Sequence, residues 1–215
     1  MSRKREDSFK IALEALRAEL RTGAHAAGAR LTANEIAERL SLSQTPVREA
    51  LSRLAGEGLL QDRRGQGFFV PSLTEHDLVV LFQLQLELLR IASEGDRSPL
   101  SAADLERLLS AGAEDGQPRN LMLASERLLR GFAAGSSSPL ARHLARLHDQ
   151  LAPIRLGEPQ VLDGLADELG HLSQAIAGGR SQAIREALAG FFERRIRAAP
   201  ALVRIQDTAA NIESI

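Results

Sequence analysis

Apolar residues recur at helical spacing along most of this chain of 215 residues. In residues 44–56 they fall at i, i+3, i+4 and i+7, on Val47, Ala50, Leu51 and Leu54, which is typical of a helix with one buried face. The same periodicity predicts a helix over 8–22 and further helices over 74–92, 101–113, 118–134, 138–151, 158–177 and 181–198. The tail from Pro200 shows no clear period, so we expect it to fray.

Between residues 30 and 72 the pattern changes to short elements with strong boundary signals. Thr32 followed by Glu35 is a capping-box pattern that predicts a short helix. Thr45 is the expected N-cap of the next helix, with Pro46 in its first turn, where a missing N–H does no harm. Two apolar segments flank the turn Arg63-Arg64-Gly65-Gln66-Gly67, which predicts a β-hairpin.

The resulting order of helix, short helix, turn, helix and hairpin is that of a winged helix-turn-helix. We therefore expect a mainly α protein with two domains, a winged helix-turn-helix over residues 1–72 and an all-helical bundle over residues 73–215. The first domain carries 12 Lys and Arg against 9 Asp and Glu, whereas the second carries 15 against 19. A basic head joined to an acidic body favours an anionic partner for the head.

Composition and missing motifs narrow the function classes. The chain has no cysteine, which excludes disulfides, thiolate zinc sites and cysteine nucleophiles. It has no phosphate-binding loop, no His-Glu-x-x-His and no Gly-x-Ser-x-Gly, which disfavours an enzyme. The most apolar stretch, residues 78–89, is too short to span a bilayer, and no apolar run follows the basic start. We expect a cytoplasmic protein without a membrane partner.

The predicted helix that begins near Thr45 has the features of a recognition helix. A B-DNA major groove admits one α-helix, whose N-terminal residues reach base edges while its apolar face packs on the domain. Gln44, Thr45 and Arg48 lie at that end. Arg63 and Arg64 of the hairpin suit the adjacent minor groove or its phosphates. Double-stranded DNA is therefore the expected partner.

Residues 10–78, and the segments TPVREAL and GQGFFV above all, resemble the N-terminal domain of the GntR family of bacterial transcription regulators. The resemblance implies contacts from the recognition helix, from Asn34 on the preceding helix and from the wing tip. The candidate DNA-binding set is Asn34, Ser43, Gln44, Thr45, Arg48, Arg53, Arg63, Arg64, Gly65 and Gln66. Many relatives have Arg at the position of Gln44. Because Gln prefers adenine and Arg prefers guanine, the operator is expected to differ at that base.

The region after the wing, led by LTEHDLVVLFQLQLELLRIA, resembles the FadR-type subfamily with its all-helical FCD domain. Such domains commonly hold a divalent metal through one Asp and three His. The matching positions here are Ser125, Leu129, Leu169 and Phe191. Because Leu and Phe have no donor atoms and Ser is a poor ligand, we expect no metal cofactor. These four residues, with Arg130 as a candidate anchor for an acid, form the predicted effector pocket.

Two hypotheses for the second domain stay open. In the first, the protein is a homodimeric repressor that binds two operator half-sites. Its pocket binds a small-molecule effector, either apolar or an organic acid, which modulates the affinity for the operator. In the second, the pocket is filled as ordinary core and the domain serves dimerisation alone. A helical enzyme is the least favoured alternative.

Overall fold

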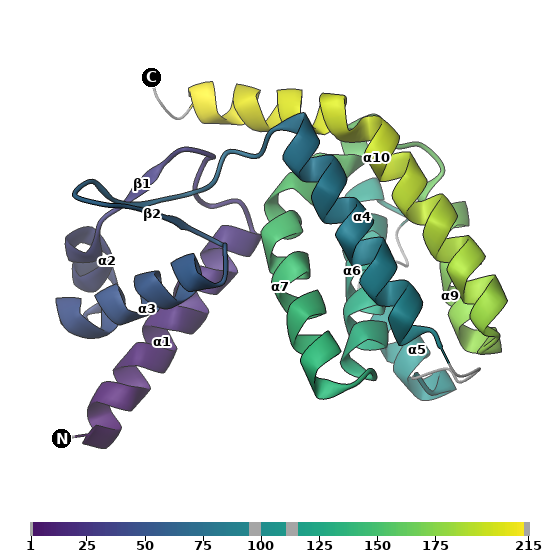
Figure 1. Ribbon diagram of the computed structural model, residues 1–215, viewed down its shortest axis with the longest axis horizontal. Helices are drawn as coiled ribbons and strands as arrows, with labels where there is room; N and C mark the ends of the chain where they lie inside the picture. Colours follow the sequence, from purple (N-terminus) through teal and green to yellow (C-terminus); the bar gives the residue numbers. More distant parts are fainter. Residues whose placement is uncertain (1, 95–99, 111–115, 213–215) are drawn as a thin grey trace. The chain divides into compact units, whose positions relative to one another are not determined.

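The computed structural model describes residues 2–94, 100–110 and 116–212 (Figure 1). The chain divides into two compact units. The first comprises Met1–Leu73 with Arg204–Ile215, and the second comprises Thr74–Val203. Each has its own hydrophobic core. The mainly α fold class, with an N-terminal winged helix-turn-helix and a helical remainder, is confirmed.

The first unit packs three helices beside a small sheet. The elements are α1 (Ser2–Arg21), β1 (Arg30–Leu31), α2 (Ala33–Leu40), α3 (Gln44–Gly56), β2 (Gln61–Arg63) and β3 (Gly67–Phe69). The sheet is antiparallel in the order β1-β3-β2. The apolar stripe of α3 is fully buried against Leu16 of α1 and its neighbours, as the periodicity predicts. The polar side of α3 is thereby turned to solvent.

The boundaries of the two short helices follow local chemistry. Thr32 is the N-cap of α2, its side chain accepting a hydrogen bond from the backbone N–H of Glu35. Ser41 ends α2 with φ of 55°, the left-handed conformation that glycine adopts with least strain. The predicted N-cap of α3 was wrong, because the extended residue at that boundary is Ser43 and the helix begins at Gln44. Pro46 still lies in the first turn, where no intrahelical N–H is required.

The hairpin is confirmed in register. Asp62 pairs with Phe68 and Arg63 with Gly67, and the turn between them uses Gly65 at φ of 75°. Strand β1 is absent from the sequence prediction because two residues, one exposed and one buried, carry no readable period.

The second unit is built from helices throughout its described residues. They are α4 (Glu75–Ala92), α5 (Ala102–Ser110), α6 (Pro118–Ala134), α7 (Ser138–Arg155), α8 (Glu158–Val161), α9 (Leu165–Gly178) and α10 (Ser181–Ile212), which continues into the first unit from Arg204. Helix α6 is central and packs against α5, α7, α8 and α9 (Figure 1). None of the described helices has the length and apolarity needed to cross a membrane.

Two differences from the predicted helices lie at Gly164 and at Pro200. The expected helix over 158–177 is two helices, because Gly164 takes φ of 64° between them. The fraying predicted from Pro200 was wrong, since α10 continues to Ile212. Ala199 and Leu202 on either side of the proline are buried in the core. Their packing outweighs the loss of one backbone hydrogen bond.

Candidate nucleic-acid interface

The N-terminal end of α3 presents its predicted DNA-contacting side chains to solvent. Ser43, Gln44, Thr45, Arg48 and Arg53 are all exposed, whereas Val47 and the rest of the apolar stripe are buried. A helix buried on one side and polar on the other can lie in a groove without unpacking its domain. This end of α3 also carries the unsatisfied backbone N–H groups of a helix N-terminus, which favour a phosphate.

Arginines on this unit fall into two groups according to their partners. Glu57 accepts from Arg17 at 2.6 Å and from Arg53 at 2.7 Å, and Glu19 is paired with Arg39. Burial alone would raise the pKa of Glu19, but hydrogen bonds from Arg39 and His25 outweigh it and lower the pKa. By contrast, no hydrogen bond or ion pair joins Arg48 or Arg64 to any described residue. No carboxylate of the described residues compensates the charge of either guanidinium group.

The predicted DNA-contacting residues of the wing lie partly on a strand and partly at the tip of the hairpin. The guanidinium of Arg63 lies 4.2 Å from the ring centroid of Phe69 and donates to Gln61 Oε1 at 3.1 Å, so this side chain is held against the strand. Arg64, Gly65 and Gln66 form the exposed tip. The N–H of Gln66 closes the turn onto the carbonyl of Arg63 at 2.8 Å. Arg64 is therefore the cation that the wing extends to solvent.

Two predicted contact residues from different helices are hydrogen-bonded to each other. Gln44 Nε2 donates to Asn34 Oδ1 at 2.7 Å, and Asn34 Nδ2 donates to Glu38 Oε1 at 3.1 Å. Sequence reasoning missed Glu38. Its only signal is the i, i+4 spacing from Asn34, which places both on one face of α2.

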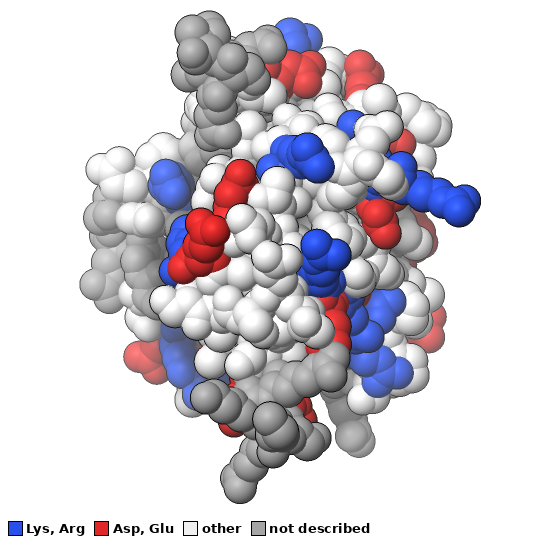
Figure 2. Space-filling view, turned by 90° about the vertical axis from the view of Figure 1, so that its left-hand side faces the viewer, with Lys and Arg blue, Asp and Glu red and all other residues white. Residues whose placement is uncertain are grey.

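Basic and acidic side chains alternate over the face of the molecule that Figure 2 draws. Figure 2 shows Lys and Arg interspersed with Asp and Glu rather than gathered into one continuous basic field. The formal net charge of the whole chain is also small, at −1. A DNA interface here depends on a few placed cations more than on a broad potential.

The residues predicted to line an effector pocket are core residues in the helical unit. Ser125, Leu129, Leu169 and Phe191 are each buried, with at most 6% of the residue surface exposed. Ser125 Oγ donates to the carbonyl of Met122 at 2.7 Å and accepts from Arg155 Nη2 at 3.1 Å. The predicted anchor Arg130 is paired with Glu126 and Asp149, both at 2.9 Å.

A buried network of two arginines and two glutamates fills the space beside these residues. Glu158 accepts from Arg155 Nε at 2.7 Å and from Arg195 Nη2 at 2.9 Å, and Arg195 also reaches Glu168 at 2.9 Å. The guanidinium of Arg195 lies 3.3 Å from the ring centroid of Phe191. The network joins α7, α8, α9 and α10, which are otherwise linked by apolar packing. None of these pairings was predicted from the sequence.

The network does not fit a divalent metal. Ser125, at the position where the resemblance implies an Asp ligand, is hydrogen-bonded to the Arg155 guanidinium, and that positive charge would repel a cation. Leu129, Leu169 and Phe191 bring no donor atoms. No three His, Asp or Glu side chains in the described part of the chain converge in a way that could hold an ion.

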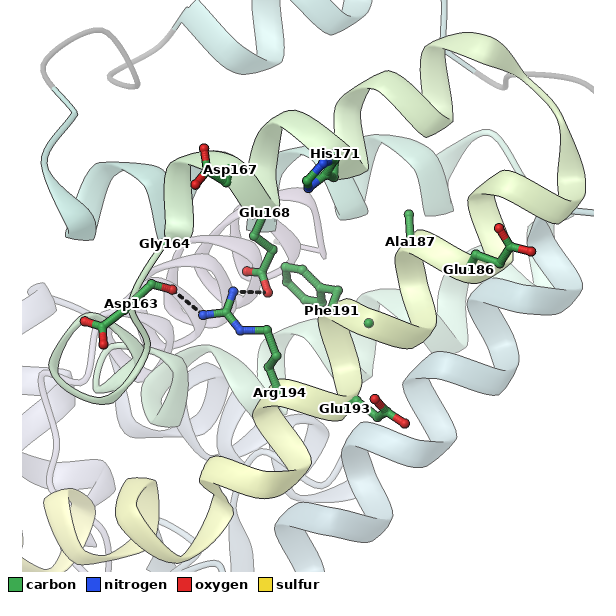
Figure 3. Close-up of a pocket in the computed structure, with 11 residues that line it drawn as sticks. Asp163, Gly164, Asp167, Glu168, His171, Glu186, Ala187, Phe191, Glu193 and Arg194 are labelled. Carbon is green, nitrogen blue, oxygen red and sulfur yellow. Dashed lines mark hydrogen bonds and ion pairs between the residues drawn. The ribbon is translucent and has the colours of Figure 1, made fainter.

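An open pocket of about 560 Å³ lies between α9 and α10. Of the predicted pocket residues only Phe191 lines it. Figure 3 shows Glu168 and Arg194 turned toward each other, at 2.8 Å, while Asp167, Glu186 and Glu193 point outward. Arg194 also donates to the carbonyl of Asp163. The guanidinium group of Arg194 therefore already has hydrogen-bond partners within the protein.

Comparison with known proteins finds similarity in the first unit. The model of bacterial regulatory proteins of the gntR family matches residues 11–70. The HTH-type transcriptional regulator McbR of Escherichia coli (strain K12) is 37% identical over 97 residues, which are 44% of this chain and 44% of that protein. The probable D-xylose utilization operon transcriptional repressor of Paenarthrobacter nicotinovorans is 48% identical over 61 residues, 28% of this chain and 27% of that protein. The matched regions thus span less than half the length of each of these two relatives.

The fold of the whole chain has a solved counterpart. The structure of E. coli McbR/YncC aligns with a TM-score of 0.74 at 24% identity, covering 90% of this chain and 97% of that one. At this identity the likeness establishes the fold of both units together with their order along the chain.

Proposed function

We propose that the chain belongs to the gntR family of bacterial regulatory proteins, whose model matches residues 11–70, and that it is a sequence-specific, DNA-binding transcriptional regulator. Its matched relatives are regulators rather than enzymes. Helix α3 enters a major groove, and the wing tip at Arg64 contacts the neighbouring minor groove or its phosphates. One relative is named a probable repressor, and we propose repression here as well.

The observation that carries this function is the contrast between the arginines of the first unit. Arg17, Arg39 and Arg53 are neutralised by carboxylates, so they add little net attraction for DNA. Arg48 on α3 and Arg64 on the wing tip are exposed and have no partner among the described residues. The recognition helix and the wing are the two elements of a winged helix that reach DNA. Unpaired cations on both are well placed to bind phosphates or guanine bases.

For the helical unit, we propose that an effector binds away from the residues predicted to line the pocket. Arg155, Arg195 and their glutamates occupy the region of the predicted pocket, which supports core rather than cavity. The open pocket between α9 and α10 then stands as the candidate effector site, with Phe191 as its apolar wall. A small apolar molecule bound there would act on operator affinity by favouring one arrangement of the DNA-binding domains.

A homodimer is supported by an exposed apolar stripe on α4. Val80, Leu84 and Ile91 are 44%, 46% and 53% exposed and lie near one face of the helix, at i, i+4 and i+11. Exposed large apolar side chains in a row are unfavourable in water. A second copy of the chain, packing the same stripe across a two-fold axis, would bury these side chains. It would also provide a second DNA-binding domain for the second operator half-site.

The test is direct binding of double-stranded DNA selected from a randomised library. We expect affinity to fall steeply with salt, and the double variant Arg48→Ala, Arg64→Ala to lose at least tenfold in affinity at fixed salt. Arg197→Ala is the matched control, because this exposed arginine lies on α10 of the helical unit and pairs with Glu193. Unchanged affinity in the double variant, or equal losses in the control, would overturn the proposal.

A further inference from the structure

A chain of three side chains links α2 to the first residue of α3. Gln44 donates to Asn34 at 2.7 Å, and Asn34 donates to Glu38 at 3.1 Å. All three residues are exposed. Asn34 and Gln44 belong to the candidate DNA-binding set, whereas Glu38 has no assigned role.

The order of donors and acceptors along this chain is set from the Glu38 end. An ionised carboxylate can only accept, so Asn34 must turn its NH₂ toward Glu38. Its carbonyl oxygen is then left for Gln44, and Gln44 must in turn present its NH₂ to that oxygen. In an isolated amide side chain the positions of the oxygen and the NH₂ group can be exchanged. Here the negative charge of Glu38 determines which end of each of the two amides donates and which accepts.

This polarity leaves Gln44 with a specific free edge. One hydrogen of Nε2 is used by Asn34, while the second hydrogen and the carbonyl oxygen Oε1 stay available. One donor beside one acceptor is the pattern that matches adenine, which offers N7 as acceptor and N6–H as donor in the major groove. Guanine presents two acceptors there, N7 and O6, and O6 would face Oε1. The free edge therefore accepts adenine and opposes guanine.

We infer that Glu38 is a positioning residue that, through Asn34, sets the adenine preference of Gln44 at one base of the operator half-site. The inference rests on the proposed DNA-binding function and identifies a determinant of its specificity. Glu38 acts without touching the base. Its negative charge weakens attraction to phosphates, so its benefit lies in discrimination rather than in affinity.

The experiment compares wild type with Glu38→Gln, Gln44→Arg and a control, Glu35→Gln. The Gln side chain at position 38 keeps size but can donate as well as accept, so the amide order is no longer determined. Glu35 is an exposed carboxylate on the same helix that lies outside the three-residue chain. Each protein is measured by fluorescence anisotropy against the DNA selected for wild type and against versions with every A·T pair changed singly to G·C.

We expect wild type to prefer A over G by about tenfold or more at one base pair of each half-site. Gln44→Arg should reverse the preference at that pair alone. Glu38→Gln should reduce it at least threefold while affinity for random DNA stays equal or rises, and Glu35→Gln should retain the full preference. Matching circular dichroism and melting temperatures establish that the variants are folded.

The outcomes separate the inference from the function on which it rests. If wild type binds selected DNA and Glu38→Gln keeps the full preference, or loses it equally at every base pair, the positioning role is wrong while DNA binding stands. If wild type shows no salt-dependent or sequence-dependent binding, the proposed function fails and the positioning role fails with it.

Discussion

Arg195 Nη2 lies 2.9 Å from Glu158 Oε2, and both side chains are 0% exposed. Two charges removed from water in this way are retained only when they are paired. Glu158 also binds Arg155, so one carboxylate compensates two guanidinium groups, with Glu168 completing the balance at Arg195. The pairing gives the helical unit a polar centre on which its stability depends.

Removing Glu158 should therefore destabilise the helical unit strongly. Glu158→Ala leaves Arg155 with no carboxylate within 4.0 Å among the described residues and Arg195 with Glu168 alone. We expect a loss of about 3–5 kcal/mol in the free energy of unfolding, measured by urea denaturation followed by circular dichroism. The control Arg197→Ala breaks an exposed pair whose side chains are 75% and 66% exposed, and it should change little. Equal effects of the two variants would contradict this account.

Acid should weaken the same network. Burial alone would raise the pKa of Glu158, but the charges of Arg155 and Arg195 outweigh burial and hold the pKa below its ordinary value of 4.5. A carboxyl with a lowered folded-state pKa contributes stability that is present above its unfolded value and is lost as pH falls through the folded value. The free energy of unfolding should thus decline below about pH 4.5.

Glu158→Gln provides the comparison for that pH dependence. Because this side chain cannot titrate, the variant should be less stable at pH 7 and should lose less on acidification to pH 3. Parallel curves for the two proteins, measured as urea midpoints across this pH range, would show that Glu158 does not contribute to the acid response.

Divalent metal should leave the helical unit unaffected. A ligand that binds only the folded state at one hundred times its dissociation constant stabilises by about 2.7 kcal/mol. We expect Zn²⁺, Ni²⁺ or Mn²⁺ at stoichiometric excess, and EDTA, to shift the melting temperature by less than about 1 °C, which is well below that effect. A reproducible increase with one metal, reversed by EDTA, would refute the assignment of this region as a charge-paired core.

Replacing Ser41 by glycine should stabilise the first unit. Ser41 adopts φ of 55° at the end of α2, a conformation that is unfavourable for side chains with a Cβ and neutral for glycine. We expect Ser41→Gly to raise the free energy of unfolding by about 0.5–1 kcal/mol. Ser52→Gly is the matched control, since this exposed serine lies inside α3 and should lower stability by a few tenths of a kcal/mol. The two midpoints moving in the same direction would exclude the backbone explanation.

A charge on the α4 stripe should disrupt the proposed homodimer. Leu84→Asp places a carboxylate in the middle of the stripe formed by Val80, Leu84 and Ile91. We expect sedimentation to show a shift from dimer to monomer, with weaker operator binding because the two half-sites are no longer read together. Ile11→Asp changes an exposed isoleucine on α1, 52% exposed, and should leave the dimer intact. A monomeric wild type, or a dimeric Leu84→Asp, would contradict the role given to α4.

Much of the first unit could be predicted because its signals are local. The Thr32 cap, the apolar stripe of α3 and the glycine turn of the wing each lie within about a dozen residues of sequence, and the structure contains all three. The start of α3 was misplaced by two residues because Thr45 and Ser43 are both suitable caps and only the backbone distinguishes them. The exposure of Gln44, Thr45 and Arg48 follows directly from the stripe on the opposite face.

The candidate effector site was less predictable, because burial depends on neighbours far away in the chain. Ser125, Leu129, Leu169 and Phe191 were expected around a cavity, and their chemistry alone is compatible with either cavity or core. Arg155 and Arg195, which fill the space beside them, carry no sequence signal that distinguishes them from the other arginines of the helical unit. Their side chains are 2% and 0% exposed, which became evident only from the packed helices.

The amino-acid sequence sufficed for most helical periods, for the hairpin and for the polar face of α3, since each is encoded by residues within a turn or two of one another. Folding alone brought together side chains distant along the chain. Arg195 meets Glu158 across 37 residues, and Gln44 meets Asn34 across 10. The buried pair forms because a charge removed from water requires a partner, and that partner is selected by helix packing rather than by spacing in sequence.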